Sequence, residues 1–117
     1  MKILQIVFCS LLLSMAVETY SQKEHKQLVD TVIKVDGICK MCKTRIENAL
    51  DLKGVKLADW DKSTHDLRLV YRKDKVTLTS LVDAINEAGH DTENSKATDE
   101  QYNNVHKCCR YREQEAH

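Results

Sequence analysis

Residues 28–50 read LVDTVIKVDGICKMCKTRIENAL, and the spacing of their apolar side chains changes at Gly37. Before Gly37, apolar or β-branched residues recur at every second position, which predicts a half-buried β-strand. From Cys42 onward they recur at the spacing of one helix face, while basic and acidic residues point away from that face. The two cysteines, Cys39 and Cys42, are therefore expected at the corner where the strand leads into the helix.

The next residues predict a hairpin and a second helix. VKLADWD (55–61) and DLRLVYR (66–72) are two runs on either side of a polar turn, as in a β-hairpin. The apolar residues of the first run fall on both faces, which a β-bulge would reconcile. LTSLVDAINEAG (78–89) has apolar residues at helical spacing and ends at the helix-stopping Gly89. His65, in the hairpin turn, is expected to face solvent.

Two further patterns complete the order of elements. HDTENSKA (90–97) predicts a short edge strand, and Thr98 with Gln101 forms a capping box that begins a brief terminal helix. The order strand, helix, strand, strand, helix, strand is that of the ferredoxin-like βαββαβ fold. We therefore expect an α+β domain with a four-stranded antiparallel sheet, two helices on one face, and a short C-terminal helix and tail.

The first residues predict a targeting segment. Lys2 precedes an apolar run that is shorter than the roughly 20 residues of a bilayer span, as in a secretory signal peptide. Residues 1–21 are assigned to this signal peptide, with cleavage after Ser21 or, as second choice, after Ala16; an uncleaved membrane anchor is the alternative. The mature protein is then expected to be exported to a bacterial periplasm, with no membrane insertion after the signal is removed.

One domain accounts for most of the mature chain. Its expected bounds are 28–95, followed by a C-terminal helix and Cys-Cys tail over 96–117. The 117-residue sequence has 18 basic and 18 acidic residues, so its even charge gives no indication of a nucleic-acid partner or an anionic membrane surface. The sequence has no paired-carboxylate site, Ser-His-Asp order or glycine-rich phosphate loop, so we expect no enzymatic activity.

Cys39 and Cys42 are the first candidate site, and five cysteines become four if Cys9 leaves with the signal. At the first turn of a helix, unpaired N–H groups and the helix dipole favour anionic sulfur, and Lys40 and Lys43 add positive charge. Thiolates select Cu(I), Zn(II) or heavier ions such as Hg(II). Two sulfurs alone suit Cu(I), whereas zinc prefers four ligands. The pair could instead form a disulfide or a thioredoxin-like redox pair, although the chain has no proline to face such a pair.

The sequence resembles the heavy-metal-associated domain family of copper chaperones, P-type ATPase metal-binding modules and periplasmic mercury-binding proteins. The resemblance covers residues 28–95 and is carried by VDGICKMCKTRIENAL, GV, W, LRLVYR and LVDAINEAGH. The family motif is Gly-Met-Thr-Cys-x-x-Cys; this chain keeps Gly37, Cys39 and Cys42, but Ile38 alone stands where the family has two residues. The resemblance implies a surface-exposed two-thiolate site that transfers Cu(I), or a similar ion, to a partner through mixed three-coordinate intermediates.

Further candidate ligands are His90 and three residues of the tail VHKCCRY (105–111). In the fold that the resemblance implies, His90 lies beside the metal loop, where it could tune the thiolates, act as a third ligand, or be an ordinary surface histidine. The tail contains His106, Cys108 and Cys109, and adjacent cysteines rarely bond to each other because the ring is strained. The tail cysteines could bond to the first pair as a redox-controlled lock, form a second soft-metal site with His106, or complete a four-sulfur site on one ion.

These patterns together predict an exported protein that binds a thiophilic ion and transfers or sequesters it, with Cu(I) ahead of Zn(II) and Hg(II). Its expected partner is a metal transporter or a metalloenzyme, which it would contact transiently. The alternative is a periplasmic thiol–disulfide protein that cycles Cys39 and Cys42, with the tail cysteines as resolving thiols.

Overall fold

The structure is a computed structural model that describes residues 27–114. The predicted signal peptide and Cys9 lie outside these residues. Within them, three strands and two longer helices are followed by a short helix and a 3₁₀ turn. No helix in the described part of the chain is long and apolar enough to cross a bilayer.

Three antiparallel strands form the sheet: β1 (Leu28–Lys34), β2 (Val55–Trp60) and β3 (Asp66–Arg72). Strand β3 lies in the middle, in the order β1-β3-β2, and β2 and β3 form the predicted hairpin. The register of this hairpin shifts between Val55 and Leu57, which confirms the predicted bulge. Because a shift of one residue exchanges the two faces of a strand, the bulge explains why the apolar residues of β2 fall on both.

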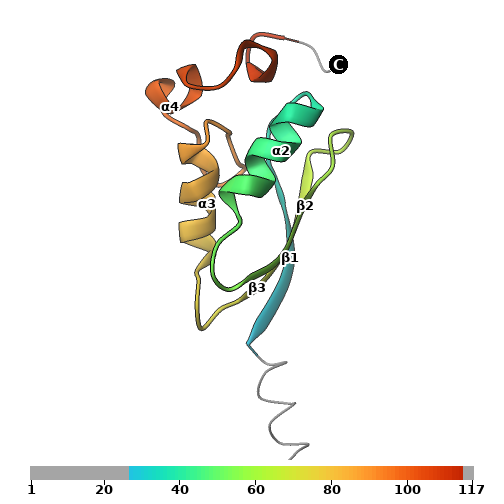
Figure 1. Cartoon of the computed structure of the whole chain (residues 1–117), viewed down its shortest axis with the longest axis vertical. Coiled ribbons are helices and arrows are strands. Elements are labelled where there is room, and N and C mark those ends of the chain that lie inside the picture. The colour runs from blue at the N-terminus through green and yellow to red at the C-terminus, as the bar shows by residue number, and fades with distance from the viewer. Residues whose placement is uncertain (1–26, 115–117) are drawn as a thin grey trace, which may run out of the picture.

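Two helices cover one face of this sheet, as Figure 1 shows, and they are α2 (Lys40–Ala49) and α3 (Leu78–Glu87). Helix α3 ends just before Gly89, whose positive φ of 95° is one that glycine adopts readily. The helices and the sheet share one core, whose fully buried residues include Val35, Ile46, Leu50, Trp60, Leu67, Leu69, Leu81 and Ile85. These layers confirm the predicted α+β ferredoxin-like fold.

The predicted fourth strand over residues 90–97 is wrong. A single isolated bridge, between Val35 and Thr92, joins this segment to the chain just after β1. The backbone then turns, because the side chain of Thr92 accepts hydrogen bonds from the backbone N–H groups of Asn94 and Ser95. Such local bonds from side chain to backbone compete with a sheet ladder. In residues 27–114 the sheet is therefore three-stranded rather than four-stranded.

A short helix and a 3₁₀ turn continue the chain past the sheet. Helix α4 (Asp99–Asn103) begins at the predicted capping box, in which the side chains of Thr98 and Gln101 each accept from the other's backbone N–H. The 3₁₀ turn η1 (Lys107–Cys109) follows. In Figure 1 this segment crosses above the start of α2, so the tail lies at the same end of the domain as the strand–helix corner.

The loop between β1 and α2 is fixed by Trp60. Its indole N–H donates to the carbonyl oxygen of Val35 at 2.9 Å, and the residue is 1% exposed. A Cβ at Gly37 would lie 2.9 Å from the indole ring, so only glycine fits there. His65 stacks on Trp60 with ring centroids 5.8 Å apart, and its side chain stays 36% exposed, so it faces solvent in part while it packs on the indole.

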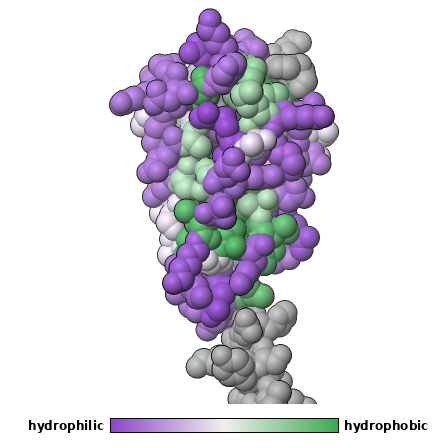
Figure 2. All heavy atoms as spheres, in the orientation of Figure 1, coloured by the Kyte–Doolittle hydropathy of each residue, from purple (hydrophilic) through white to green (hydrophobic). Residues whose placement is uncertain are grey.

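The surface in the view of Figure 2 is mainly hydrophilic, with apolar side chains gathered toward its lower part. Large apolar side chains that are exposed among the described residues are Val32, Met41, Leu52 and Leu57. One of them, Met41, lies between the two cysteines of the first pair, so it borders the candidate site.

Ile46→Ala is expected to lower the free energy of unfolding by about 2–5 kcal/mol, because it leaves a cavity where α2 packs on the sheet. Ile46 has 0% exposure. Val32→Ala, at a side chain that is 53% exposed, is the control and should change this free energy by less than about 0.5 kcal/mol. Chemical denaturation of the reduced protein measures both, and equal effects would contradict the assigned core.

Candidate metal centre

Cys39 and Cys42 lie at the start of helix α2, where the sequence predicts them. Cys39 is the N-cap residue, with an extended backbone (φ −147°, ψ 173°), and Cys42 lies in the first turn. Both are free thiols, and their Sγ atoms are 3.5 Å apart. One ion could bridge this separation, because two metal–sulfur bonds of about 2.3 Å each span up to about 4.6 Å.

The tail brings two more sulfur atoms to this pair. The Sγ of Cys109 is 3.7 Å from that of Cys39 and 3.9 Å from that of Cys108. The Sγ atoms of Cys39, Cys108 and Cys109 all lie within 4.8 Å of one another. The Cys39 thiol also donates to the carbonyl oxygen of Cys108 at 3.5 Å, and the Cys108 thiol donates to the Sδ of Met41 at 3.4 Å. The tail is therefore folded back onto the first pair, and we term Cys39, Cys42, Cys108 and Cys109 the sulfur cluster.

The sulfur cluster is mostly enclosed, so the expected surface exposure of the first pair is wrong. Cys42 and Cys109 have 0% exposure, and Cys39 has 8%. Turn η1, which carries Cys108 and Cys109, lies against α2. Cys108 is partly exposed, and the neighbouring Met41 is 45% exposed. The open edge of the cluster is therefore at Cys108 and Met41.

The thiols of the sulfur cluster differ in acidity. Burial raises the pKa of Cys39, but hydrogen bonds from backbone N–H groups at the start of α2 and from the thiols of Cys42 and Cys109 outweigh it, so its pKa is lowered overall. Burial raises the pKa of Cys42. Burial also raises the pKa of Cys109, and the neighbouring sulfurs of Cys42 and Cys39 add to that rise. Of these three thiols, Cys39 is therefore the first to become a thiolate in the metal-free protein.

The structure places neither candidate histidine in the sulfur cluster. His90 is fully buried, and its Nδ1 lies 2.8 Å from the carbonyl oxygen of Asp36, which makes Nδ1 the donor. Burial lowers the pKa of His90, so its ring is neutral. Its Nε2 is buried without a hydrogen-bond partner. His106 is exposed and precedes η1, and the group of ligand atoms that lie within 4.8 Å of one another contains cysteines alone.

His90 lies under the tail, where it supports Tyr111. The two rings are stacked, with centroids 5.3 Å apart. The Tyr111 hydroxyl donates to the carbonyl oxygen of Gly89 and accepts from the backbone N–H of Asp91, both at 2.8 Å. These contacts fix the chain two residues beyond the last cysteine of the sulfur cluster.

Arg112 fixes the next residue of the tail through a two-pronged ion pair with Asp91. Its Nε and Nη2 lie 3.0 Å and 2.7 Å from the two carboxylate oxygens, and Asp91 is 5% exposed. Burial raises the pKa of Asp91, but Arg112 and the backbone N–H of Ala97 outweigh it, so its pKa is lowered and the carboxylate stays charged. Arg112 also donates to the carbonyl oxygen of Ala97 and lies over the ring of Tyr102, 4.3 Å from its centroid. We term Asp91, Tyr111 and Arg112 the tail anchor.

The tail anchor was not predicted from the sequence. Tyr111 and Arg112 follow the tail cysteines after Arg110, and an aromatic and a basic residue so close to the cysteines are the local signal that the sequence offers. Their partner Asp91 lies in the segment expected to be an edge strand, which gave no reason to expect a buried carboxylate. An ion pair between the segment after α3 and the tail leaves no periodic pattern in the sequence, so it could not be predicted.

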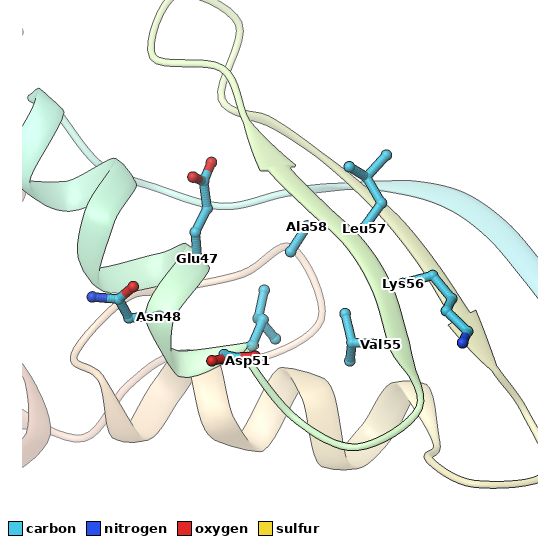
Figure 3. Close-up of a pocket in the computed structure, with 8 residues that line it drawn as sticks. Glu47, Asn48, Asp51, Val55, Lys56, Leu57 and Ala58 are labelled. Atoms are coloured by element: carbon cyan, nitrogen blue, oxygen red, sulfur yellow. The ribbon is translucent and has the colours of Figure 1, made fainter.

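A shallow groove between α2 and β2 lies at the other end of α2 from the cysteines (Figure 3). Its volume is about 270 Å³, and it is lined by Glu47, Asn48, Leu50, Asp51, Val55, Lys56, Leu57 and Ala58. No cysteine or histidine lines this groove, so it forms no part of the candidate metal centre.

The fold and the sulfur cluster together define a class of protein: a small α+β domain that carries soft-metal ligands at its first strand–helix corner. No family model matches the sequence. The copper chaperone CopZ of Staphylococcus epidermidis is 35% identical over 66 residues, which are 55% of this chain and 97% of that protein. The chain therefore belongs to the heavy-metal-associated domain family, and staphylococcal relatives that it matches are named copper chaperones.

Solved structures have the same fold. A CopZ metallochaperone superposes with a TM-score of 0.53 at 30% identity, over 55% of this chain and 98% of that one. Oxidized MerP from Ralstonia metallidurans CH34 has a TM-score of 0.53 at 20% identity, over 56% of this chain and 94% of that one, which shows a shared fold alone. The match takes in 97% of the staphylococcal relative. That relative therefore has no counterpart for the part of this chain outside the 66 matched residues.

Cys39→Ser is expected to remove the first ionisation step of the reduced, metal-free protein. Burial raises the pKa of Cys39, but hydrogen bonds from backbone N–H groups and from the neighbouring thiols lower it overall, so we assign the first step to Cys39. Cys109→Ser should keep the step, because the pKa of Cys109 is raised and a serine hydroxyl can still donate to Cys39. The ultraviolet absorbance of thiolates, followed against pH, measures this. A first step that survives in Cys39→Ser would contradict the assignment.

Proposed function

We propose that the protein binds Cu(I) through the thiolates of Cys39 and Cys42 and transfers it to a partner. The carrying observation is the pair of sulfurs 3.5 Å apart at the first turn of α2, in a chain of the heavy-metal-associated family. Unpaired N–H groups at this helix start favour anionic sulfur. Two thiolates in one turn give a soft, low-coordinate ligand set.

Cu(I) is the proposed ion because of the ligands and of the relatives. Thiolate sulfur is the softest ligand that proteins offer, and it favours Cu(I) over hard ions such as magnesium. The staphylococcal relative is named a copper chaperone, and the solved CopZ is named a metallochaperone. Zn(II) and Hg(II) are the competing ions, since both also bind thiolates.

A protein partner is proposed because a chaperone gives up its ion by ligand exchange. A thiolate of the partner would bind the ion before Cys39 or Cys42 leaves it, so no free ion forms. We propose a metal transporter or a metalloenzyme for this transient contact. The protein itself is then a carrier and not an enzyme.

The double variant Cys39→Ser/Cys42→Ser is expected to weaken Cu(I) binding by more than about 100-fold, beyond the 10–100-fold typical of losing a group outside the ligand shell. Titration of the reduced protein with Cu(I) against a competing chelator measures this affinity. His106→Ala is the control, because His106 is exposed and outside the sulfur cluster, and it should bind as the unaltered protein does.

Unchanged affinity in the double cysteine variant would contradict the proposed metal site. Efficient catalysis of insulin reduction by the unaltered protein would point to the thiol–disulfide alternative. Both assays use the same reduced preparation, so the two functions are compared directly.

We also propose that the protein acts after export, with residues 1–21 removed. The support is the sequence pattern of a charge followed by a short apolar run. When the full chain is produced in a bacterium, the exported fraction should contain a protein whose mass corresponds to an N-terminus at Gln22. Recovery of the uncleaved chain in the membrane fraction would support the anchor instead.

A further inference from the structure

We propose that Cys108 and Cys109 complete the metal site, so that the tail is a sulfur-bearing lid that closes over the ion held by Cys39 and Cys42. This inference rests on the proposed function and adds two ligands and a closing element to it. The resulting site holds the ion in a shell of three or four thiolates rather than two.

Three of the four sulfurs are close enough to share one ion, because those of Cys39, Cys108 and Cys109 all lie within 4.8 Å of one another. The sulfur of Cys42 lies outside this mutual group but 3.5 Å from that of Cys39. Consecutive Sγ–Sγ distances are 3.5 Å from Cys42 to Cys39, 3.7 Å from Cys39 to Cys109, and 3.9 Å from Cys109 to Cys108. Sulfurs bound at about 2.3 Å lie about 3.8 Å apart around a tetrahedral ion and about 4.0 Å apart around a trigonal one. Cys39 is central in this arrangement, because its sulfur contacts both the first pair and the tail.

The tail anchor holds this arrangement from outside the ligand set. Arg112 and Tyr111 bind residues 89–91 of the domain, and neither contributes an atom to the sulfur cluster. The backbone of Cys108 adds a further contact, since its carbonyl oxygen accepts from the Cys39 thiol. The lid is therefore held both by the tail anchor and by the hydrogen bond from the Cys39 thiol to Cys108. Its two cysteines lie in the chain between α4 and the tail anchor.

The two other arrangements of the tail fit the structure less well. A second site with His106 would need that side chain beside the cysteines, but it is exposed and outside the group. A lock by disulfides would need bonded sulfurs, whereas all four described cysteines are free thiols. When the thiols bind an ion they release their protons to solvent, so no oxidant is needed.

A closed lid changes how the ion leaves. The sulfurs of Cys42 and Cys109 are inaccessible, so a partner thiolate cannot reach an ion bound there from their side. The open edge lies at Cys108 and at the thioether of Met41. A partner thiolate would approach from this edge, and release of the ion then requires the tail thiolates to leave it, at a rate that depends on the strength of the anchor.

The first test counts the sulfurs around one equivalent of Cu(I). X-ray absorption on the anaerobic, reduced protein should give three or four sulfurs, and the double variant Cys108→Ser/Cys109→Ser should give two. The same variant should bind Cu(I) at least about tenfold more weakly against a chelator. Two sulfurs in the unaltered protein, or equal affinity of both proteins, would overturn the proposal while leaving the function of Cys39 and Cys42 standing.

The second test keeps every sulfur and loosens the lid. Arg112→Gln removes the ion pair with Asp91, and transfer of Cu(I) to a chelator should become about tenfold faster, the ratio expected when one charge-assisted pair is lost. Arg68→Gln is the matched control, because Arg68 makes a similar two-pronged pair with Asp30, at 3.2 Å and 2.8 Å, on the exposed sheet. Its transfer rate should not change.

Two outcomes of these tests would overturn the proposal that the tail is a lid. Equal transfer rates for Arg112→Gln and Arg68→Gln would show that the anchor does not control release. A protein isolated anaerobically with a bond between a tail cysteine and Cys39 or Cys42, which takes up no Cu(I) until it is reduced, would show a redox lock in its place. Loss of Cu(I) binding in Cys39→Ser/Cys42→Ser, measured in parallel, shows that the proposed function itself holds.

Discussion

The position of one sulfur atom, the Sγ of Cys39, is the constraint on which the site depends. It contacts Cys42 on its own helix and Cys109 on the tail, at 3.5 Å and 3.7 Å. This position follows from where α2 begins. Each residue turns an α-helix by about 100°, so a start one residue later would turn Cys42 away from Cys39. The loop that leads into α2 passes close to Trp60, whose ring leaves no room for a Cβ at Gly37.

A carrier must bind its ion tightly and yet release it to a partner. In the proposed site, the groups that bind the ion differ from the groups that control its release. There, sulfur atoms would provide the ligands, while a carboxylate, a guanidinium and a phenol hold the segment that carries Cys108 and Cys109. Because the holding groups touch no sulfur, their strength can change without changing the chemistry of the ligand set. A two-thiolate domain without such a segment has no comparable means of adjusting how long it keeps its ion.

Much of the fold could be predicted because burial imposes periods on the sequence. Helices α2 and α3 and the β2–β3 hairpin, with its bulge, lie where the apolar spacing placed them. The prediction of a fourth strand was wrong because the side chain of Thr92 accepts a hydrogen bond from the backbone of Asn94. The alternation of apolar and polar residues does not reveal such a local hydrogen bond. The first cysteine pair was predictable from its spacing. The tail was not, because its position depends on an ion pair between Asp91 and Arg112, 21 residues apart.

The buried core of the domain does not stop at residue 95, where the family resemblance ends. Tyr102, Val105 and Cys109 belong to the same apolar cluster as the strands and the two main helices. A fragment cut at that boundary would expose the ring of His90, which stacks on Tyr111, and would remove Arg112 and Ala97, the partners of the Asp91 carboxylate. The segment after residue 95 is therefore part of the folding unit. Residues 28–95 grafted alone into another protein are not expected to keep the loop with Cys39 and Cys42 in this arrangement.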